Sequence, residues 1–129
     1  MTFAITAPYA ALLTILMFAL TQLVIRTRGK AKVGLGDGGN TQLLEAMRRQ
    51  ANFVENVPLA LLLMAFAEAG GAGAMVLNIA GIALVLARLV HPFGIKSDKP
   101  AHPARIAGAV VTNFVQLAMV VVILMQYFT

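Results

Sequence analysis

Residues 3–25 read FAITAPYAALLTILMFALTQLVI, a run of 23 residues that contains no charged side chain. A helix needs about 20 predominantly apolar residues to cross a membrane. Residues 106–128 form a second uncharged run, and residues 72–90 form a third that contains a single charge, Arg88. These three runs predict three membrane-spanning helices.

A fourth apolar run, residues 57–67, follows a polar stretch over 41–56 that contains neither glycine nor proline. We therefore expect one long helix over 42–69, amphipathic in its first half and apolar in its second. The sequence then predicts an all-α integral membrane protein, a bundle of four transmembrane helices that forms a single domain over residues 1–129. The expected spans are residues 3–25, 42–69, 72–94 and 105–128.

The composition excludes several classes of protein. Hydrophobic residues make up 60% of the chain and charged residues 12%, with a mean hydropathy of +0.84, whereas a soluble domain has about 45–50% apolar and roughly 25% charged residues. The chain has no cysteine, which excludes a disulfide scaffold, a thiolate zinc site and a cysteine nucleophile. Its two histidines, His91 and His102, have no third ligand at a suitable spacing, so we expect no metal site.

Lysine and arginine side chains are confined to one side of the predicted bundle. All ten fall within residues 26–49 and 88–105, and the connection around Gly70 and Gly71 has none. The positive-inside rule makes the basic side cytoplasmic and places both termini on the other side. Because the arginines follow the first apolar run rather than precede it, we expect a retained span and not a cleaved signal peptide.

The first basic connection is rich in glycine over residues 29–39. It lacks the GxxxxGK[ST] pattern of a phosphate-binding loop, so a flexible surface loop is expected. No basic motif with interleaved aromatic residues is present, and nucleic acid is therefore not an expected partner. The basic side chains are expected to contact anionic lipid of the bilayer.

Four polar residues of the second predicted helix recur at steps of three and four, so they share one face. These residues are Glu45, Arg48, Asn52 and Glu55. Glu55 lies three residues before Pro58, at the boundary of the apolar run. A carboxylate at this depth is unfavourable by a few kcal/mol unless a cation accompanies it.

Two interpretations of this polar cluster remain open. Arg48, Arg88 and Arg105 are candidate partners for Glu55. In a purely structural interpretation, Glu55 pairs with one arginine, Asn52 bridges two helices and no ligand binds, because polar contacts between membrane helices are common. In a functional interpretation, the arginines outnumber the acids, and the surplus positive charge attracts an anionic ligand that also carries one ammonium group.

The segment EAMRRQANFVENVP, residues 45–58, resembles the signature of the MAPEG family, the membrane-associated proteins of eicosanoid and glutathione metabolism. The family pattern R-x-x-x-N-x-x-E-x-x-P is filled here by Arg48, Asn52, Glu55 and Pro58.

Two other stretches add to this resemblance. The segment RLVH over residues 88–91 is followed by Gly94, and Arg105 lies at the start of the fourth span. The Gly-rich loop and the short connections are similar to those of bacterial members, which implies location in a bacterial inner membrane.

The resemblance implies a homotrimer with three sites, each between neighbouring protomers and facing the cytoplasm, and it implies glutathione as the ligand. Glutathione has two carboxylates and one ammonium group, which suits the charge pattern of the cluster. Arg105 resembles the family arginine that stabilises the thiolate, since a fixed positive charge lowers the pKa of a nearby thiol. The residues that the resemblance assigns to glutathione binding are Arg26, Arg48, Gln50, Asn52, Glu55, Arg88 and His91, with Arg28 as the alternative to Arg26.

The activity implied is that of a membrane-bound glutathione transferase or peroxidase acting on hydrophobic electrophiles that enter from the bilayer. The eicosanoid enzymes have a tyrosine where this chain has His91 and Ile95, so eicosanoid substrates are not implied. The alternative is a non-catalytic protein that keeps the fold as an accessory subunit of a larger membrane complex. A small transporter is disfavoured, because the charged groups lie at one boundary rather than near the midplane.

Overall fold

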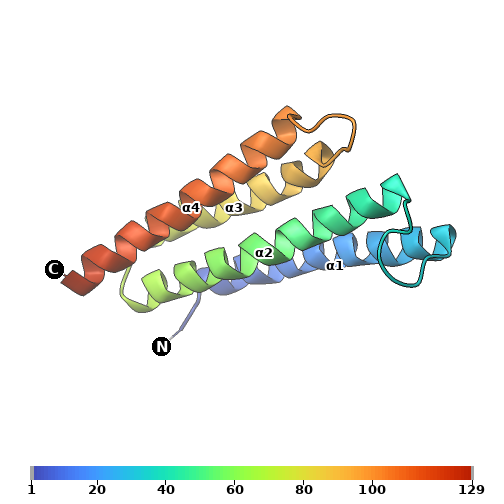
Figure 1. Ribbon diagram of the computed structural model, residues 1–129. Coiled ribbons are helices and arrows are strands. Elements are labelled where there is room, and N and C mark those ends of the chain that lie inside the picture. The colour runs from blue at the N-terminus through green and yellow to red at the C-terminus, as the bar shows by residue number, and fades with distance from the viewer. Residues whose placement is uncertain (1, 129) are drawn as a thin grey trace.

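The computed structural model describes residues 2–128, which form four long helices and one short 3-10 turn (Figure 1). The helices are α1 (Thr6–Ala31), α2 (Thr41–Ala69), α3 (Ala74–Val90) and α4 (Pro103–Phe128), and the turn η1 (His91–Gly94) continues α3. Met1 and Thr129, which the predicted domain includes, lie outside the described residues. α1, α2, α3 with η1, and α4 are each long and apolar enough to cross a membrane, which confirms the predicted all-α fold class.

Consecutive helices run in opposite directions. The order around the bundle is α1, α2, α4, α3, because α2 packs against α1 and α4 while α3 packs against α4 and α1. The α1–α2 and α3–α4 connections lie at one end, and the two termini and the α2–α3 connection lie at the other (Figure 1). We call the first of these the basic end, because both of its connections contain lysine or arginine.

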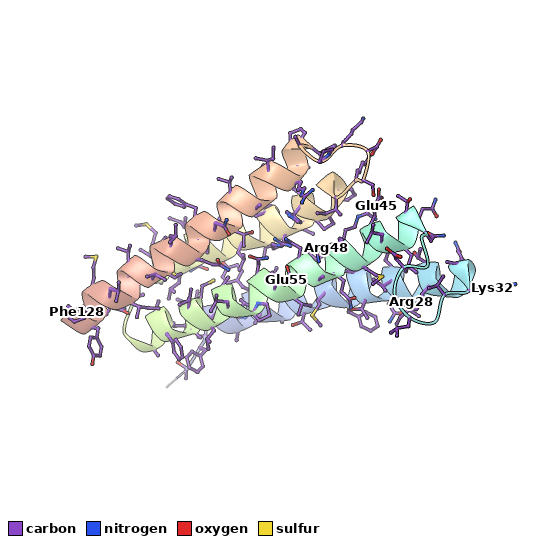
Figure 2. The ribbon with its side chains drawn as sticks, viewed as in Figure 1. Arg28, Lys32, Glu45, Arg48, Glu55 and Phe128 are labelled. Atoms are coloured by element: carbon purple, nitrogen blue, oxygen red, sulfur yellow. The ribbon has the colours of Figure 1, made fainter. Side chains whose placement is uncertain are left out.

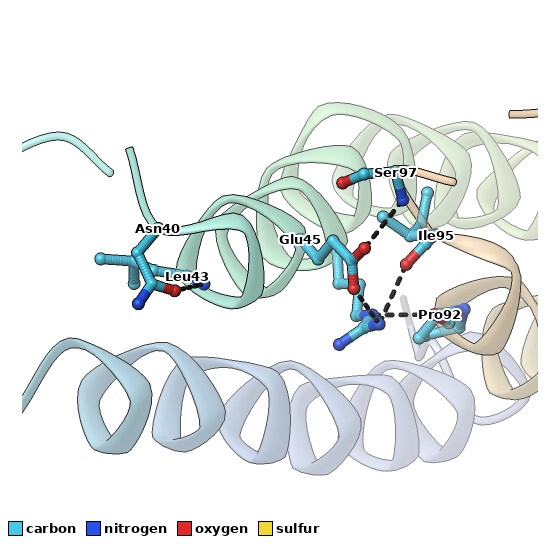
Figure 3. A network of polar contacts seen from close by, with 7 residues as sticks. Asn40, Leu43, Glu45, Pro92, Ile95 and Ser97 are labelled. Atoms are coloured by element: carbon cyan, nitrogen blue, oxygen red, sulfur yellow. Dashed lines mark hydrogen bonds and ion pairs between the residues drawn. The ribbon is translucent and has the colours of Figure 1, made fainter. Parts of the chain in front are cut away.

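The helix ends differ from the predicted spans by a few residues, and local chemistry explains where α1 ends, where α2 begins and where α3 ends. α1 continues past residue 25, because a basic side chain ends a hydrophobic run but does not end a helix. It stops at Lys32, whose left-handed backbone (φ 55°) donates its N–H to the carbonyl of Gly29. α2 begins after Asn40, whose side-chain oxygen accepts a hydrogen bond of 2.9 Å from the N–H of Leu43 (Figure 3). The α-helical part of α3 ends at Val90, because Pro92 has no N–H to continue it.

Most of the buried side chains of the bundle are apolar, and so is most of its outer surface. Leu13, Phe53 and Met64 are among the side chains that are almost fully buried in the core. On the outside, Ile15 is 68% exposed and Phe114 is 72% exposed, and many other large apolar side chains are similarly open. Such a surface is stable against lipid rather than water, and helices suit it because they satisfy their own backbone hydrogen bonds.

The end opposite the basic end is held together by Glu68, near the end of α2. Its carboxylate accepts hydrogen bonds of 2.8 Å from the backbone N–H groups of Ile5 and Thr6. These groups open α1 and have no partner within the helix, and a carboxylate there also interacts favourably with the helix dipole. Gln126 of α4 donates a hydrogen bond of 3.0 Å to the carbonyl of Ala67. This end of the bundle thus joins α1, α2 and α4 by polar contacts.

Replacing Glu68 with alanine should lower the free energy of unfolding by about 1 kcal/mol, the usual effect of losing a helix N-cap. The N–H groups of Ile5 and Thr6 would lose their acceptor. The measurement is denaturant unfolding of the purified protein in detergent micelles. Glu68→Gln retains one acceptor oxygen and should lose less stability than Glu68→Ala. If Glu68→Ala were as stable as the unaltered protein, this role of Glu68 would be wrong.

Candidate functional site

A cavity of about 140 Å³ opens at the basic end between α2, the α3–α4 connection and the first turn of α4. We call it the basic cavity. It is lined by Leu44, Glu45, Arg48, Asn52, Ile95, Lys96, Ser97 and Arg105. The structure therefore brings three predicted site residues, Arg48, Asn52 and Arg105, to one cavity, although Arg105 is far from the other two in sequence.

Glu55 lies on α2 about two helical turns beyond Arg48 (Figure 2). The two side chains form an ion pair with an N–O distance of 3.8 Å. Both side chains remain open, with 54% of Arg48 and 57% of Glu55 exposed. An exposed pair at this distance contributes little to stability. Arg48 and Glu55 are therefore both accessible to a ligand or to a second copy of the chain.

Arg88 is enclosed by the bundle, with 1% of its surface exposed. One guanidinium nitrogen donates a hydrogen bond of 2.8 Å to the side-chain oxygen of Asn52, and the guanidinium carbon lies 5.6 Å from the centre of the Phe53 ring. Its Nε has no hydrogen-bond partner, and no carboxylate within residues 2–128 forms an ion pair with it. Arg88 thus holds Asn52 in the cavity wall and leaves an unneutralised positive charge behind it.

Arg105 lies in the first turn of α4, where one guanidinium nitrogen donates a hydrogen bond of 3.3 Å to the carbonyl of Pro100. Its backbone packs directly on Gly94, so that a Cβ atom on Gly94 would overlap the backbone nitrogen of Arg105. His91, which precedes this contact, is buried and does not line the basic cavity. Its Nδ1 has no hydrogen-bond partner among the described residues. The position of Arg105 therefore depends on the close approach of η1 and α4.

Arg49 makes the contacts that hold the α3–α4 connection against α2. Its Nε donates to the carbonyl of Pro92 and one terminal nitrogen donates to that of Ile95, each at 2.9 Å, and the same nitrogen lies 3.3 Å from Glu45. The other oxygen of Glu45 accepts a hydrogen bond of 2.7 Å from the N–H of Ser97 (Figure 3). We use the name Arg49 clamp for Arg49 and Glu45 together with the backbone groups that they bind, the carbonyls of Pro92 and Ile95 and the N–H of Ser97.

No sequence signal singled out the Arg49 clamp. The spacing of Glu45 and Arg49 suits an ion pair on one helix, but the main acceptors are backbone carbonyls more than 40 positions away. Backbone carbonyls occur at every residue and leave no mark in a sequence. The clamp forms because the fold places η1 beside α2.

Three other predicted residues lie away from the basic cavity. Gln50 donates a hydrogen bond of 2.8 Å to the hydroxyl of Thr21 in α1, and Arg26 lines a separate cavity. Arg28 donates hydrogen bonds to the carbonyls of Val33 and Gly36 at 3.2 and 2.8 Å, and so holds the Gly-rich connection. Within one chain, none of these side chains meets Arg48.

Replacing Arg49 with glutamine should lower the free energy of unfolding by about 2 kcal/mol, because partly buried hydrogen bonds to a charged group are lost. Thermal unfolding in detergent measures this change. Lys30→Gln, which removes an exposed charge at the same end of the molecule, is the matched control and should change stability little. Equal effects of the two substitutions would show that the Arg49 clamp does not hold the connection.

Gly94→Ala should destabilise the protein and displace Arg105, because the added Cβ would overlap the backbone of Arg105. Gly29→Ala is the control, since a Cβ at that position of α1 meets nothing within 4 Å. Thermal unfolding of both variants in detergent is the measurement. A Gly94→Ala protein as stable as Gly29→Ala would contradict the close approach of η1 and α4.

Comparisons with known proteins agree with the predicted family. The sequence matches the MAPEG family over residues 6–125. It is 39% identical over 90 residues to Inner membrane protein YecN of Escherichia coli strain K12, and equally to the protein of that name from strain O6:H1 (CFT073). In both cases the match covers 70% of this chain and 69% of the relative. The relative is named as an inner membrane protein of a bacterium, and this chain has four helices long and apolar enough to cross a membrane. Together these findings confirm the predicted localisation in a bacterial inner membrane. Because the family match covers nearly the whole described chain, this protein belongs to the MAPEG family, as residues 45–58 predicted.

Proposed function

We propose that this protein is a membrane-bound glutathione transferase or peroxidase whose site is the basic cavity, facing the cytoplasm. The observation that carries the proposal is the buried Arg88, which has no carboxylate partner in the described chain and supports Asn52 in the cavity wall. A guanidinium inside a membrane bundle is costly, and such groups by default indicate a functional site. Arg48 and Arg105 add their charges to the same wall.

The charges around the basic cavity suit glutathione. Arg48, Lys96 and Arg105 line it, and Glu45, the acid in its lining, is bonded to Arg49 and to the N–H of Ser97. Glu55 is the open acid on the same face of α2. In the proposed site, Arg48 binds a carboxylate of glutathione, Glu55 binds its ammonium group, and Asn52 binds its peptide backbone.

The proposal includes the homotrimer that the family resemblance implies. An adjacent copy is needed because the basic cavity of a single chain is too small for a tripeptide. Its 140 Å³ falls below the roughly 300–1,000 Å³ of most small-molecule sites. Arg48 lines it and is half exposed, and its ion-pair partner Glu55 is equally open, so an adjacent copy would complete the enclosure. Gln50 lies elsewhere on its own chain and would reach only a ligand bound to an adjacent copy. Arg26 lines the separate cavity and has no part in the proposed glutathione site.

Glutathione bound in this site supplies a sulfur nucleophile. The fixed charge of Arg105 favours loss of the thiol proton to solvent and stabilises the negative charge left on sulfur. The apolar outer faces of the helices admit a hydrophobic electrophile from the bilayer. In the transferase reaction the sulfur bonds to the electrophilic carbon, and the leaving group departs with its electron pair.

A second candidate function is that of a non-catalytic accessory subunit in a larger membrane complex. The observation that favours it is that polar groups of the site find partners within the chain. Arg88 bonds to Asn52, Arg48 pairs with Glu55, and Arg105 bonds to the carbonyl of Pro100. In this case the cluster stabilises the bundle and activates no thiol.

Titrating the detergent-solubilised protein with glutathione and with its S-hexyl derivative distinguishes the two functions. Binding of either ligand should raise the melting temperature in proportion to the logarithm of ligand concentration above Kd. Only glutathione has a free thiol, so only glutathione should add thiolate absorbance when it binds to the protein. No shift with either ligand, or a shift without thiolate, would favour the accessory subunit.

Two variants separate binding from activation in the same assay. Arg48→Gln should lose the melting-temperature shift, because the guanidinium that binds a carboxylate of glutathione is removed. Arg105→Ala should keep the shift but lose thiolate absorbance and slow conjugation of a test electrophile by about 10²-fold or more. The control is Lys99→Gln, because Lys99 is a basic residue of the α3–α4 connection that does not line the basic cavity. An Arg105→Ala protein with unchanged turnover would remove Arg105 from the mechanism.

A further inference from the structure

A second cavity, of about 520 Å³, lies on another side of the bundle between α1 and the corner formed by α3 and η1. We call it the α1–α3 groove. Its walls are mainly leucine, alanine, proline and phenylalanine side chains, among them Leu16, Ala19 and Phe93. Phe93 is 74% exposed at its mouth. The groove is thus apolar and open to the surroundings of the bundle.

Two cationic side chains line the groove where it reaches the basic end of the bundle. Arg26 and Lys96 both line it, and neither side chain forms a hydrogen bond or ion pair with any residue in the range 2–128. Arg49 also lines the groove, but its guanidinium is bonded within the Arg49 clamp. The groove therefore presents two unpaired positive charges at one end and apolar walls along the rest.

The length of the groove matches one leaflet of a bilayer. Arg26 follows directly after the uncharged run of α1, so it marks the membrane boundary. Leu16 lies ten residues before Arg26, which corresponds to about 15 Å along a helix. The hydrocarbon core of a bilayer is about 30 Å thick. The groove therefore extends from the boundary to about the midplane, which is the depth reached by one acyl chain.

We propose that the α1–α3 groove binds one anionic phospholipid of the surrounding leaflet. The phosphate lies between Arg26 and Lys96, and one acyl chain follows α1 from Leu23 towards Leu16. Basic pockets between membrane helices attract acidic headgroups, and each lysine or arginine near the surface adds about a fivefold preference for an anionic lipid. A lipid without net charge carries its own cation beside the phosphate, so it would neutralise Arg26 and Lys96 less well than an anionic lipid does.

The groove and the basic cavity share the corner that the Arg49 clamp holds. Pro92 lines the groove and Ile95 lines the basic cavity, and Arg49 binds the carbonyls of both. The lipid site nevertheless does not rest on the proposed thiol chemistry. Its test contains no glutathione, so the two proposals fail independently.

The chain contains no tryptophan, which allows a single reporter to be introduced. Phe93→Trp places it at the mouth of the groove, and Phe114→Trp places it on α4 at nearly the same exposure, 72% against 74%, outside the groove. Each protein is reconstituted in phosphatidylcholine vesicles containing a small fraction of phosphatidylglycerol with brominated acyl chains, and fluorescence quenching is measured. We expect the F93W protein to favour phosphatidylglycerol over phosphatidylcholine by about fivefold or more, and the F114W protein to show no preference.

Further substitutions in the F93W protein test the two parts of the site. Arg26→Gln or Lys96→Gln should each lower the preference by about fivefold, whereas Lys99→Gln, outside the groove, should not. Ala19→Phe should abolish the preference by filling the groove, with Ala11→Phe on the same helix as its control.

Three results would overturn the lipid site. The first is equal quenching of the F93W protein by brominated phosphatidylglycerol and phosphatidylcholine. The second is stronger quenching by a brominated fatty acid than by phosphatidylglycerol, which would assign the groove to a carboxylate amphiphile. The third is insensitivity to every brominated lipid, which would show that a second copy of the chain covers the groove.

Discussion

The guanidinium of Arg49 bonds to two backbone carbonyls and to Glu45, and the organisation of the basic end depends on this set of contacts. Pro92 interrupts α3, and the chain must turn to start α4 with backbone groups that no helix satisfies. Arg49 and Glu45 satisfy several of these groups from α2. They thereby place Ile95 and Ser97 in the wall of the basic cavity and Pro92 in the wall of the α1–α3 groove.

The arginines of this chain serve different ends according to their depth and partners. Arg28 and Arg49 are bonded to backbone carbonyls and order connections. Arg88 is buried, supports Asn52 and has no carboxylate partner in the described chain. Arg26 and Arg48 remain open. A structural role accounts for the bonded arginines, whereas the buried and open ones leave positive charge that a ligand can use, which is the physical basis of both proposals.

The fold was predictable to a large extent from hydropathy, because a bilayer accepts few structures other than apolar helices of a set length. The site was predictable only in part. Arg48 and Asn52 lie four positions apart, and helical periodicity alone places them on one face. The resemblance assigned Gln50 and His91 to glutathione binding, yet within one chain Gln50 bonds to Thr21 and His91 is buried away from the basic cavity. A motif states which residues are present, but not which helix each side chain faces.

The sequence by itself determined the four helices, their alternating directions and the gathering of basic residues at one end, since these follow from local apolar length and from charge in the connections. Only the tertiary structure decided which polar groups meet. Glu68 reaches the first N–H groups of α1, Arg49 reaches the carbonyls beyond α3, and Arg105 enters the cavity of Arg48. Each of these contacts joins residues distant in sequence, and several involve backbone atoms that every residue shares. Packing of the helices, and not any local pattern, brings them within hydrogen-bonding distance.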